Sequence, residues 1–193
     1  MMSSSSGIST EVAMAIQGVV LDVDGVLTDA GIYVGMGPGG HALELKRFDI
    51  QDGLGIRILQ EVGIRVAVVS GRVSEATTLR MAELGVEECH QDPGAQKLPV
   101  VEEIRRRWGL RWSQMAMLGD DLPDLPVLTR VGLAVAVANA VPEVKSRCNW
   151  ITSVPGGKGA VRDFARILLS ARGEWELAVD RYLEARGGLG VGS

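Results

Sequence analysis

Four short apolar runs constrain the fold of this 193-residue chain more than any other feature of its sequence. Apolar residues are continuous within each run and do not alternate with polar ones, which is typical of strands buried on both faces of a sheet. Aromatic residues make up only 4% of the chain, so the core around these strands must be aliphatic. The predicted strands are Gly18–Leu21, Val66–Val69, Met115–Leu118 and Leu133–Val137.

Amphipathic segments with helical periodicity lie between these runs. The predicted helices are Asp52–Val62, Ser74–Leu84, Leu98–Trp108 and Gly159–Ala171. Alternation of strand and helix predicts a Rossmann-like α/β fold, with a parallel sheet, right-handed crossovers and helices on both faces. Ligands of such sheets bind beyond the carboxyl ends of the strands, so a functional site is expected there.

Residues 31–48 depart from this alternation. They form two extended arms around Gly37-Pro38-Gly39-Gly40, and polar and apolar residues nearly alternate along residues 41–48. We therefore predict a β-hairpin flap that projects from the domain after the first strand. Residues 35–40 also match the dinucleotide pattern G-x-G-x-x-G, but no helix follows, and Pro38 suits a hairpin tip better than a phosphate-binding turn.

Polar side chains follow three of the predicted strands at the point where each strand ends. Asp22 and Asp24 follow the first run, Ser70-Gly71-Arg72 the second, and Gly119-Asp120-Asp121 the third, while Lys97 opens a predicted helix. Each has an ordinary explanation when taken alone, since acids offset a helix dipole, a serine caps a helix and a lysine is solvated. Their coincidence at one edge of a parallel sheet favours a functional site.

The chemistry open to these residues is phosphoryl transfer. Asp22 and Asp120 can share a hard cation such as Mg²⁺, which would also relieve repulsion between the clustered carboxylates. A carboxylate can attack phosphorus to form an aspartyl-phosphate, and a second acid two residues later can protonate the leaving alkoxide and then activate water. The Ser70 hydroxyl, a nearby backbone N–H such as that of Gly71, and the Lys97 ammonium can hold the phosphoryl oxygens.

Charge and composition argue against several other classes of protein. The net charge of −4 argues against a nucleic-acid-binding surface, and no apolar run reaches the roughly 20 residues of a membrane span. Two cysteines, Cys89 and Cys148, provide no disulfide framework, so a cytoplasmic protein is expected. Cys89-His90 could indicate a soft-metal site, but two adjacent ligands without partners favour an ordinary strand end. The first residues, MMSSSSGISTE, lack the basic and apolar regions of a secretory signal.

In their order along the chain, these residues resemble the four motifs of the haloacid dehalogenase superfamily. The resemblance spans roughly residues 17 to 172 and implies that Asp22 is the nucleophile and Asp24 the general acid and base. It also implies that Asp22, the backbone carbonyl of Asp24 and Asp120 bind Mg²⁺, with Asp121 in support. The matching motifs are Asp22-Val23-Asp24-Gly25-Val26-Leu27-Thr28, Ser70, Lys97 and Gly119-Asp120-Asp121-Leu122-Pro123-Asp124.

The intervals between these motifs are too short for a separate cap domain. The chain therefore resembles the capless subclass, and within it the family of 3-deoxy-D-manno-octulosonate 8-phosphate phosphatases. The local matches to that family are Val26-Leu27-Thr28-Asp29, Lys46-x-Phe48 followed by Asp52-Gly53, Ser70-Gly71-Arg72, and Gly156-Gly157-Lys158-Gly159-Ala160-Val161-Arg162.

This closer resemblance implies a Mg²⁺-dependent, cytoplasmic phosphoric monoester hydrolase of lipopolysaccharide biosynthesis that acts on a sugar-acid phosphate. Lys46 and Arg72 are then expected to contact the anionic substrate. Members of that family are tetramers in which the hairpins and C-terminal tails of neighbours help to close each active site, so a homotetramer is expected. The predicted domain organisation of the chain is a flexible N-terminus over 1–15, the phosphatase domain over 16–172 with the flap at 31–48, and a C-terminal helix and flexible tail over 173–193.

Three alternatives remain open from the sequence. The same chemistry could act on 2-keto-3-deoxy-nononic or sialic acid 9-phosphate. A phospho-receiver signalling domain also combines acids, Mg²⁺, a hydroxyl and a lysine on a parallel sheet, but the pair Asp22 and Asp24 together with Asp120-Asp121 disfavours it. A non-catalytic relative used for assembly would not need to retain all four motifs.

Overall fold

The computed structural model describes residues 7–188 of the chain. A six-stranded parallel sheet lies at its centre, in the order β5-β4-β1-β6-β7-β8. Every predicted strand is confirmed, with its ends within one residue of the prediction. The strands of this sheet are β1 (Gly18–Leu21), β4 (Arg65–Ser70), β5 (Glu88–Gln91), β6 (Met115–Gly119), β7 (Leu133–Ala136) and β8 (Trp150–Ile151).

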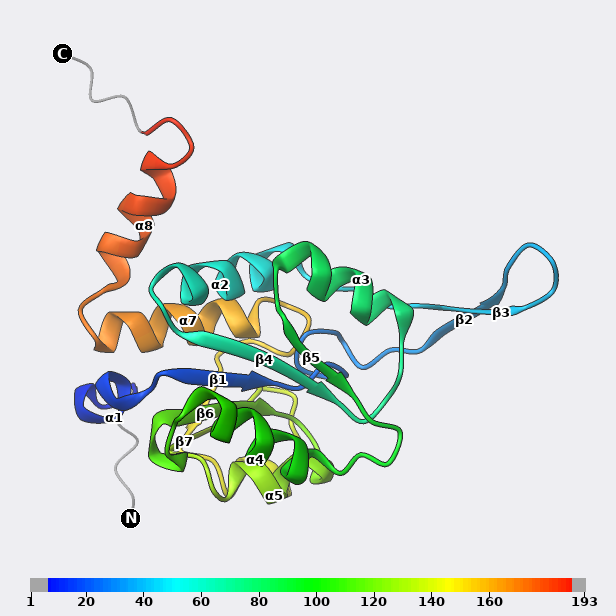
Figure 1. Ribbon diagram of the computed structural model, residues 1–193, viewed down its shortest axis with the longest axis horizontal. Coiled ribbons are helices and arrows are strands. Elements are labelled where there is room, and N and C mark those ends of the chain that lie inside the picture. The colour runs from blue at the N-terminus through cyan, green and yellow to red at the C-terminus, as the bar shows by residue number, and fades with distance from the viewer. Residues whose placement is uncertain (1–6, 189–193) are drawn as a thin grey trace.

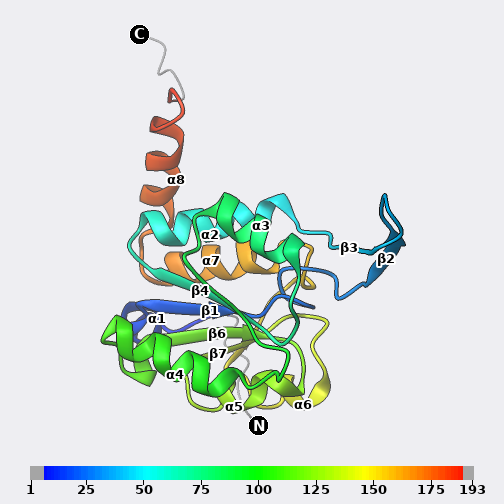
Figure 2. The same ribbon diagram turned by 45° about the vertical axis from the view of Figure 1, so that its right-hand side comes forward.

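Helices cover both faces of the sheet, as predicted. Helices α2, α3 and α7 lie on one face, and α4, α5 and α6 lie on the other (Figures 1 and 2). The four predicted helices correspond to α2, α3, α4 and α7, with ends within two residues of the prediction. The helices are α1 (Thr10–Ala15), α2 (Ile50–Glu61), α3 (Glu75–Leu84), α4 (Lys97–Trp108), α5 (Leu125–Leu128), α6 (Pro142–Lys145), α7 (Ala160–Ala171) and α8 (Trp175–Glu184), with short 3₁₀ helices at Trp112–Gln114 and Leu122–Asp124.

The core is aliphatic and lies against both faces of the central strands. All four residues of β1 are buried, because it pairs with β4 on one side and β6 on the other and is covered by helices above and below. The apolar stripe of α7, including Val161, Phe164 and Leu168, packs into this core. Gly55 lets α2 approach α7 closely, since a Cβ at this position would lie 2.9 Å from the Cα of Arg162.

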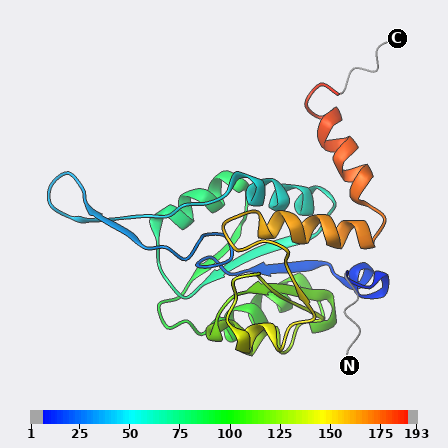
Figure 3. The ribbon, with the colours of Figure 1, turned by 180° about the vertical axis from the view of Figure 1, so that it is seen from behind.

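The predicted flap is an antiparallel hairpin of β2 (Tyr33–Met36) and β3 (Ala42–Leu45), in which Tyr33 pairs with Leu45. It projects from the end of the sheet at which the β1 arrow ends, while α8 stands away from the body at the other end (Figures 1 and 3). Within residues 7–188 the chain has no separate cap domain, which agrees with the predicted capless fold.

Residues 10–15 differ from the flexible N-terminus predicted for 1–15, because they form helix α1. The Ser9 side chain accepts a hydrogen bond from the Val12 amide at the start of this helix, and Ala13 is fully buried. Helix α1 has six residues, and Ala13 is the one among them that is buried. So short a helix shows no periodic apolar pattern in the sequence. Residues 1–6 and 189–193, where flexible ends were also predicted, lie outside the described residues.

Two edge strands and two short helices were not assigned bounds from the sequence. β5 reads ECHQ and is only half-buried, so it lacks the apolar run that identified the central strands. β8 has two residues, and α5 and α6 have four residues each, too few for a periodic pattern. Among the described helices, none is both long enough and apolar enough to cross a membrane.

Candidate active site

The carboxyl ends of β1, β4 and β6 meet the start of α4 around a cavity of about 380 Å³. The hairpin projects from the end of the sheet at which β1 ends (Figure 1), and residues that follow β1 line the cavity. The structure therefore brings together the polar groups that the sequence placed at separate strand ends. The cavity is lined by Asp22, Asp24, Ala30, Ser70, Gly71, Arg72, Ala95, Lys97, Asp120, Asp121, Pro123 and Asp124.

A buried lysine that lines this cavity lies between two carboxylates. Lys97 Nζ donates to Asp22 Oδ1 at 2.5 Å and to Asp124 Oδ1 at 2.6 Å. Asp22 is the first residue after β1 and Lys97 the first of α4, and the side chains of all three residues are at most 6% exposed. Because charges are buried only when they are paired, this contact fixes the position of both the ammonium and the Asp22 carboxylate.

The sequence places Asp124 in the last of the four motifs but assigns it no role of its own. Its Oδ1 accepts from Lys97, while its Oδ2 accepts from the backbone N–H of Asp120 at 2.9 Å and of Asp121 at 3.3 Å. Asp124 thus holds the loop after β6 and the lysine in one arrangement. The spacing of Asp121 and Asp124 is that of a capping box, which is the signal that could have identified this role.

Acids outnumber cations in this cluster. Burial raises the pKa of Asp22 well above its usual range, and repulsion from Asp124 adds to this rise, while the charge and hydrogen bond of Lys97 oppose it. Burial and the charge of Asp124 likewise raise the pKa of Asp120 to about 6. Burial alone would lower the pKa of Lys97, but the charges of Asp22 and Asp124 outweigh it and raise that pKa. The cluster therefore carries a surplus of negative charge that a cation would neutralise.

The geometry of these acids fits a hard cation. One carboxylate oxygen each from Asp22, Asp120 and Asp124 lie within 4.8 Å of one another. Gly25 has φ +103°, and a Cβ at this position would lie 2.0 Å from Asp120 Oδ2, so only glycine allows the loop after β1 to approach that carboxylate. Oxygen donors with excess negative charge are the ligand set preferred by Mg²⁺.

The two other predicted metal ligands lie outside this group of oxygens. The Asp121 carboxylate accepts from the Leu122 N–H at 2.7 Å and caps the 3₁₀ helix that follows. The Asp24 carboxylate instead accepts a hydrogen bond from Lys46 Nζ at 2.6 Å. The sequence prediction assigned the backbone carbonyl of Asp24, and not its side chain, to the metal.

The residues predicted to hold phosphate lie on the β4 side of the cavity. Ser70 ends β4 and is 1% exposed, and its Oγ accepts from the Arg72 N–H at 3.1 Å, which leaves its own proton free to donate. Gly71 lines the same cavity beside Ala95, and a Cβ on Gly71 would lie 2.9 Å from the Ala95 Cβ. A hydroxyl, a backbone amide and the Lys97 ammonium therefore line one cavity.

The base of the hairpin contacts two residues that line the cavity, Asp24 and Arg72, although Glu44 and Lys46 do not line it themselves. Lys46, just after β3, donates to Asp24, and its side chain is only 3% exposed. Arg72 Nη2 donates to Glu44 Oε2 at 2.6 Å, and Arg72 Nε lies 3.8 Å from Asp24 Oδ2. The sequence predicted Lys46 and Arg72 as substrate contacts but did not single out Glu44, because its partner lies 28 residues away in the chain.

A loop after β8 supports the loop that carries the first acids. The Gly157 N–H donates to Val26 O at 2.9 Å, and Arg47 Nη1 donates to Gly157 O at 2.7 Å. Asp52 of α2 is buried, which raises its pKa to about 6, and it accepts from three backbone N–H groups at the start of α7. Those amides belong to residues 159, 161 and 162, so the Asp52-Gly53 and Gly156–Arg162 motifs meet here as a supporting structure.

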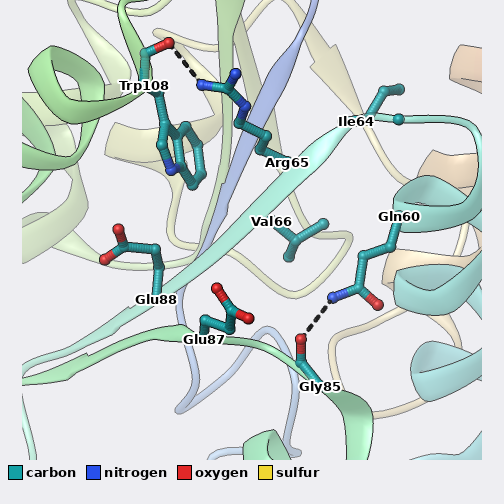
Figure 4. Close-up of a pocket in the computed structure, with 9 residues that line it drawn as sticks. Gln60, Ile64, Arg65, Val66, Gly85, Glu87, Glu88 and Trp108 are labelled. Atoms are coloured by element: carbon teal, nitrogen blue, oxygen red, sulfur yellow. Dashed lines mark hydrogen bonds between the residues drawn. The ribbon is translucent and has the colours of Figure 1, made fainter.

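A larger cavity of about 450 Å³ lies at the opposite end of β4, where Arg65 begins the strand (Figure 4). Its polar groups are partly engaged, since Arg65 donates to Trp108 O at 2.6 Å and Gln60 donates to Gly85 O at 3.2 Å (Figure 4). Its lining includes Glu87 and Glu88 but no lysine or hydroxyl group. The smaller cavity at the carboxyl ends of the strands is therefore the better candidate for phosphate chemistry.

Comparison with known proteins identifies relatives of the whole fold. A family model described as haloacid dehalogenase-like hydrolase matches residues 91–162. The chain is 39% identical over 160 residues to the 3-deoxy-D-manno-octulosonate 8-phosphate phosphatase KdsC of Escherichia coli strain K12, which covers 83% of this chain and 82% of the relative.

Solved structures of similar proteins extend this likeness. The 3-deoxy-D-manno-octulosonate 8-phosphate phosphatase of Moraxella catarrhalis, in complex with magnesium, phosphate and KDO, superposes with a TM-score of 0.82 at 32% identity, covering 90% of this chain and 97% of that one. The cobalt-bound deoxy-D-mannose-octulosonate 8-phosphate phosphatase of Haemophilus influenzae gives a TM-score of 0.78 at 36% identity, with coverages of 86% and 94%.

Proposed function

Because the chain belongs to the haloacid dehalogenase-like hydrolases and is a phosphoric monoester hydrolase, we propose that it hydrolyses 3-deoxy-D-manno-octulosonate 8-phosphate. The observation that carries this proposal is one cavity in which Lys97 lies between Asp22 and Asp124, while Arg72 lines the same cavity and Lys46 contacts Asp24. The acids and Lys97 suit a phosphoryl group, and Arg72 and Lys46 suit the carboxylate of a sugar acid.

In the proposed first step, an Asp22 carboxylate oxygen forms a bond to phosphorus as the bond from phosphorus to the sugar oxygen breaks. Asp24 gives its proton to that sugar oxygen, so the sugar leaves as an alcohol. In the second step, Asp24 takes a proton from water, and the resulting hydroxide attacks the phosphorus of the aspartyl-phosphate. Inorganic phosphate leaves, and the Asp22 carboxylate and the Asp24 proton are restored.

The remaining groups position the phosphoryl oxygens. Ser70 Oγ, the Gly71 N–H and Lys97 Nζ would donate to them, and Lys97 would also hold Asp22 at the correct angle of attack. Asp22, Asp120 and the backbone carbonyl of Asp24 would hold Mg²⁺, which when bound neutralises charge on the phosphoryl group. Both oxygens of Asp124 already accept hydrogen bonds, so it orients Lys97 and the loop after β6.

The test is phosphate release from a panel of phosphate monoesters, measured with Mg²⁺ and with EDTA. The panel should contain the eight-carbon sugar-acid phosphate, a nine-carbon sugar-acid 9-phosphate, a neutral sugar phosphate and p-nitrophenyl phosphate. We expect the highest kcat/KM for the eight-carbon acid, and loss of activity in EDTA. A higher kcat/KM for the nine-carbon acid would assign the alternative substrate, and preference for the neutral sugar phosphate would contradict both.

Asp24→Asn is expected to slow hydrolysis of the sugar-acid phosphate by about 10² to 10⁴-fold, because the leaving alkoxide then lacks a proton donor. The p-nitrophenolate group leaves without protonation, so formation of the aspartyl-phosphate from p-nitrophenyl phosphate should fall much less. The two substrates are compared in a rapid-mixing experiment that follows the first turnover. An equal loss with both substrates would remove Asp24 from the role of acid in the first step.

We also propose that the chain works in the cytoplasm as a homotetramer. The hairpin exposes large apolar side chains, including Val34 at 71% and Met36 at 72%, which is typical of a surface covered by another chain. A site without a cap domain is open to water, and a neighbouring chain that covered it would strengthen the electrostatic contacts inside.

Deleting residues 173–193 is expected to change KM or product release for the sugar-acid phosphate more than hydrolysis of p-nitrophenyl phosphate. The physical reason is that a neighbour's tail would contact the sugar and not the phosphoryl group. A shorter deletion of residues 185–193 keeps α8, whose Trp175 packs under Arg162 at 4.4 Å, and so separates tail effects from loss of packing. A monomer by light scattering that retains full sugar-acid selectivity would defeat the assembly proposal.

A further inference from the structure

The second arm of the hairpin presents two charged residues, Glu44 and Lys46, toward the candidate active site. Side chains alternate between the two faces of an extended segment, so residues 44 and 46 share one face while Leu43 and Leu45 occupy the other. Leu43 and Leu45 are exposed at 43% and 58%, whereas the Lys46 side chain is only 3% exposed. The charged face of this arm is thus the one that packs on the domain.

Four charged groups form a closed ring where the hairpin meets the domain. Lys46 Nζ lies 2.6 Å from Asp24 Oδ1 and 3.9 Å from Glu44 Oε1. Arg72 completes the ring, with Nη2 at 2.6 Å from Glu44 Oε2 and Nε at 3.8 Å from Asp24 Oδ2. Positive and negative groups alternate, so Glu44 balances one of the two cations and Asp24 the other.

Glu44 holds Arg72 away from the catalytic acid. The guanidinium makes its short contact with Glu44, and only a longer one with Asp24. Without a carboxylate at position 44, Arg72 would be free to form a two-pronged pair with Asp24, which is the stronger geometry for an arginine and a carboxylate. Its guanidinium would then no longer be available to an anionic substrate.

One oxygen of Glu44 has no hydrogen-bond donor. Glu44 Oε1 is buried and accepts no hydrogen bond from any residue that the structure describes. The nearest cation, Lys46, is 3.9 Å away and is already bonded to Asp24. A buried acceptor of this kind needs a partner. Because Glu44 contacts Arg72, which lines the cavity, a hydroxyl group of a bound polyhydroxy acid can supply the missing donor.

We propose that Glu44 is a specificity-determining residue of this enzyme. Its Oε2 holds Arg72 where the guanidinium meets the carboxylate of the substrate, and its Oε1 accepts a hydrogen bond from a hydroxyl group of the sugar. This inference rests on the proposed function, since it takes a polyhydroxylated sugar acid as the substrate. A site built to bond a hydroxyl discriminates strongly against substrates that lack it, because its own polar group is then left unpaired.

The test is steady-state kinetics of Glu44→Gln with the eight-carbon sugar-acid phosphate and with p-nitrophenyl phosphate. We expect KM for the sugar-acid phosphate to rise by about tenfold or more, the size expected for a lost charged hydrogen bond. The loss of kcat/KM with p-nitrophenyl phosphate should be smaller by about a factor of ten, because that substrate has neither a carboxylate nor a sugar hydroxyl. An equal loss with both substrates would overturn the proposal and make Glu44 a structural tie for the hairpin.

Glu83→Gln is the matched control, because it makes the same substitution and removes the ion pair with Arg80 on the surface of α3. Glu83→Gln should leave kcat and KM unchanged for both substrates. Thermal unfolding of both variants checks that the fold is intact.

The double variant Glu44→Gln with Arg72→Gln tests whether Glu44 acts through Arg72. If it does, the fold-loss of kcat/KM for the sugar-acid phosphate in the double variant is smaller than the product of the fold-losses in the two single variants. The reason is that both substitutions disrupt the same contact to the substrate. Fully multiplicative losses would overturn the coupling. A wild-type enzyme with no preference for the sugar-acid phosphate would overturn the proposed function itself, whereas a preference that Glu44→Gln preserves would overturn only the role of Glu44.

Discussion

Replacement of Asp22 by asparagine is expected to abolish turnover of every phosphate monoester while the chain stays folded. A neutral amide is a poor nucleophile toward phosphorus and a weaker ligand for Mg²⁺. Loss of a catalytic nucleophile lowers kcat by many orders of magnitude in other hydrolases, so we expect a fall of at least about 10⁴-fold. Phosphate release with a sugar-acid phosphate and with p-nitrophenyl phosphate measures it, and turnover within tenfold of wild type would contradict the assignment of Asp22.

The stability of this variant provides an internal check. The raised pKa of Asp22 means that its ionised form is disfavoured in the folded chain, so at neutral pH the charge itself costs stability. Asparagine removes that charge, and Lys97 keeps its contact with Asp124. We therefore expect Asp22→Asn to unfold at the same temperature as wild type or at a higher one, when both are measured in EDTA.

Lys97→Met is expected to lower both stability and turnover. The substitution leaves the buried carboxylates of Asp22 and Asp124 without their shared cation, and breaking a buried ion pair from one side costs about 3 to 5 kcal/mol. It also removes a donor to the phosphoryl group, so kcat/KM should fall by at least about 10²-fold. Denaturant unfolding in EDTA measures the first effect, and phosphate release in Mg²⁺ measures the second.

The pH dependence of Lys97→Met follows from the remaining acids. Asp22 and Asp120 have raised pKa values in the folded chain, so they bind protons more readily there than when unfolded. Stability of the variant should therefore rise as the pH falls from 7 toward 5, a range that contains the pKa of about 6 of Asp120. Lys145→Met on α6 is the matched control for loss of a lysine outside the cavity. A stability of Lys97→Met equal to that control at pH 7 would show that the buried pairs are not needed for folding.

The central strands could be predicted because each is a continuous apolar run between turns. Strands β1 and β6 are covered on both faces, so every one of their residues is buried and apolar or small. The sequence therefore shows a continuous apolar run for each strand. The edge strand β5 is exposed along one side and is built from Glu88-Cys89-His90-Gln91, so no comparable trace exists. Helix α1 forms because Ala13 packs against the body, which is a tertiary contact that local sequence does not encode.

The sequence predicts which residues come together in the candidate site, because parallel strands all end at one edge of the sheet. Asp22, Ser70, Lys97 and Asp120 all line the cavity as this rule requires. Their pairing was not predictable, since it depends on distances set by packing. Asp124 belongs to the last motif but has no assigned role in the sequence, and Glu44 looks like an ordinary surface acid. Only the structure shows them bonded to Lys97 and Arg72.

The cap that Asp52 forms on α7 links two parts of the chain that are made at different times. Its carboxylate accepts hydrogen bonds from the amides of Gly159, Val161 and Arg162, which lie 107 to 110 residues further along the chain. During synthesis, the buried carboxylate of α2 has no partner until these residues leave the ribosome. Because α7 also covers β1, a nascent chain that ends before residue 171 lacks a face of its core. The domain therefore closes late, and a premature stop codon before residue 160 leaves a chain without the helix that completes its core.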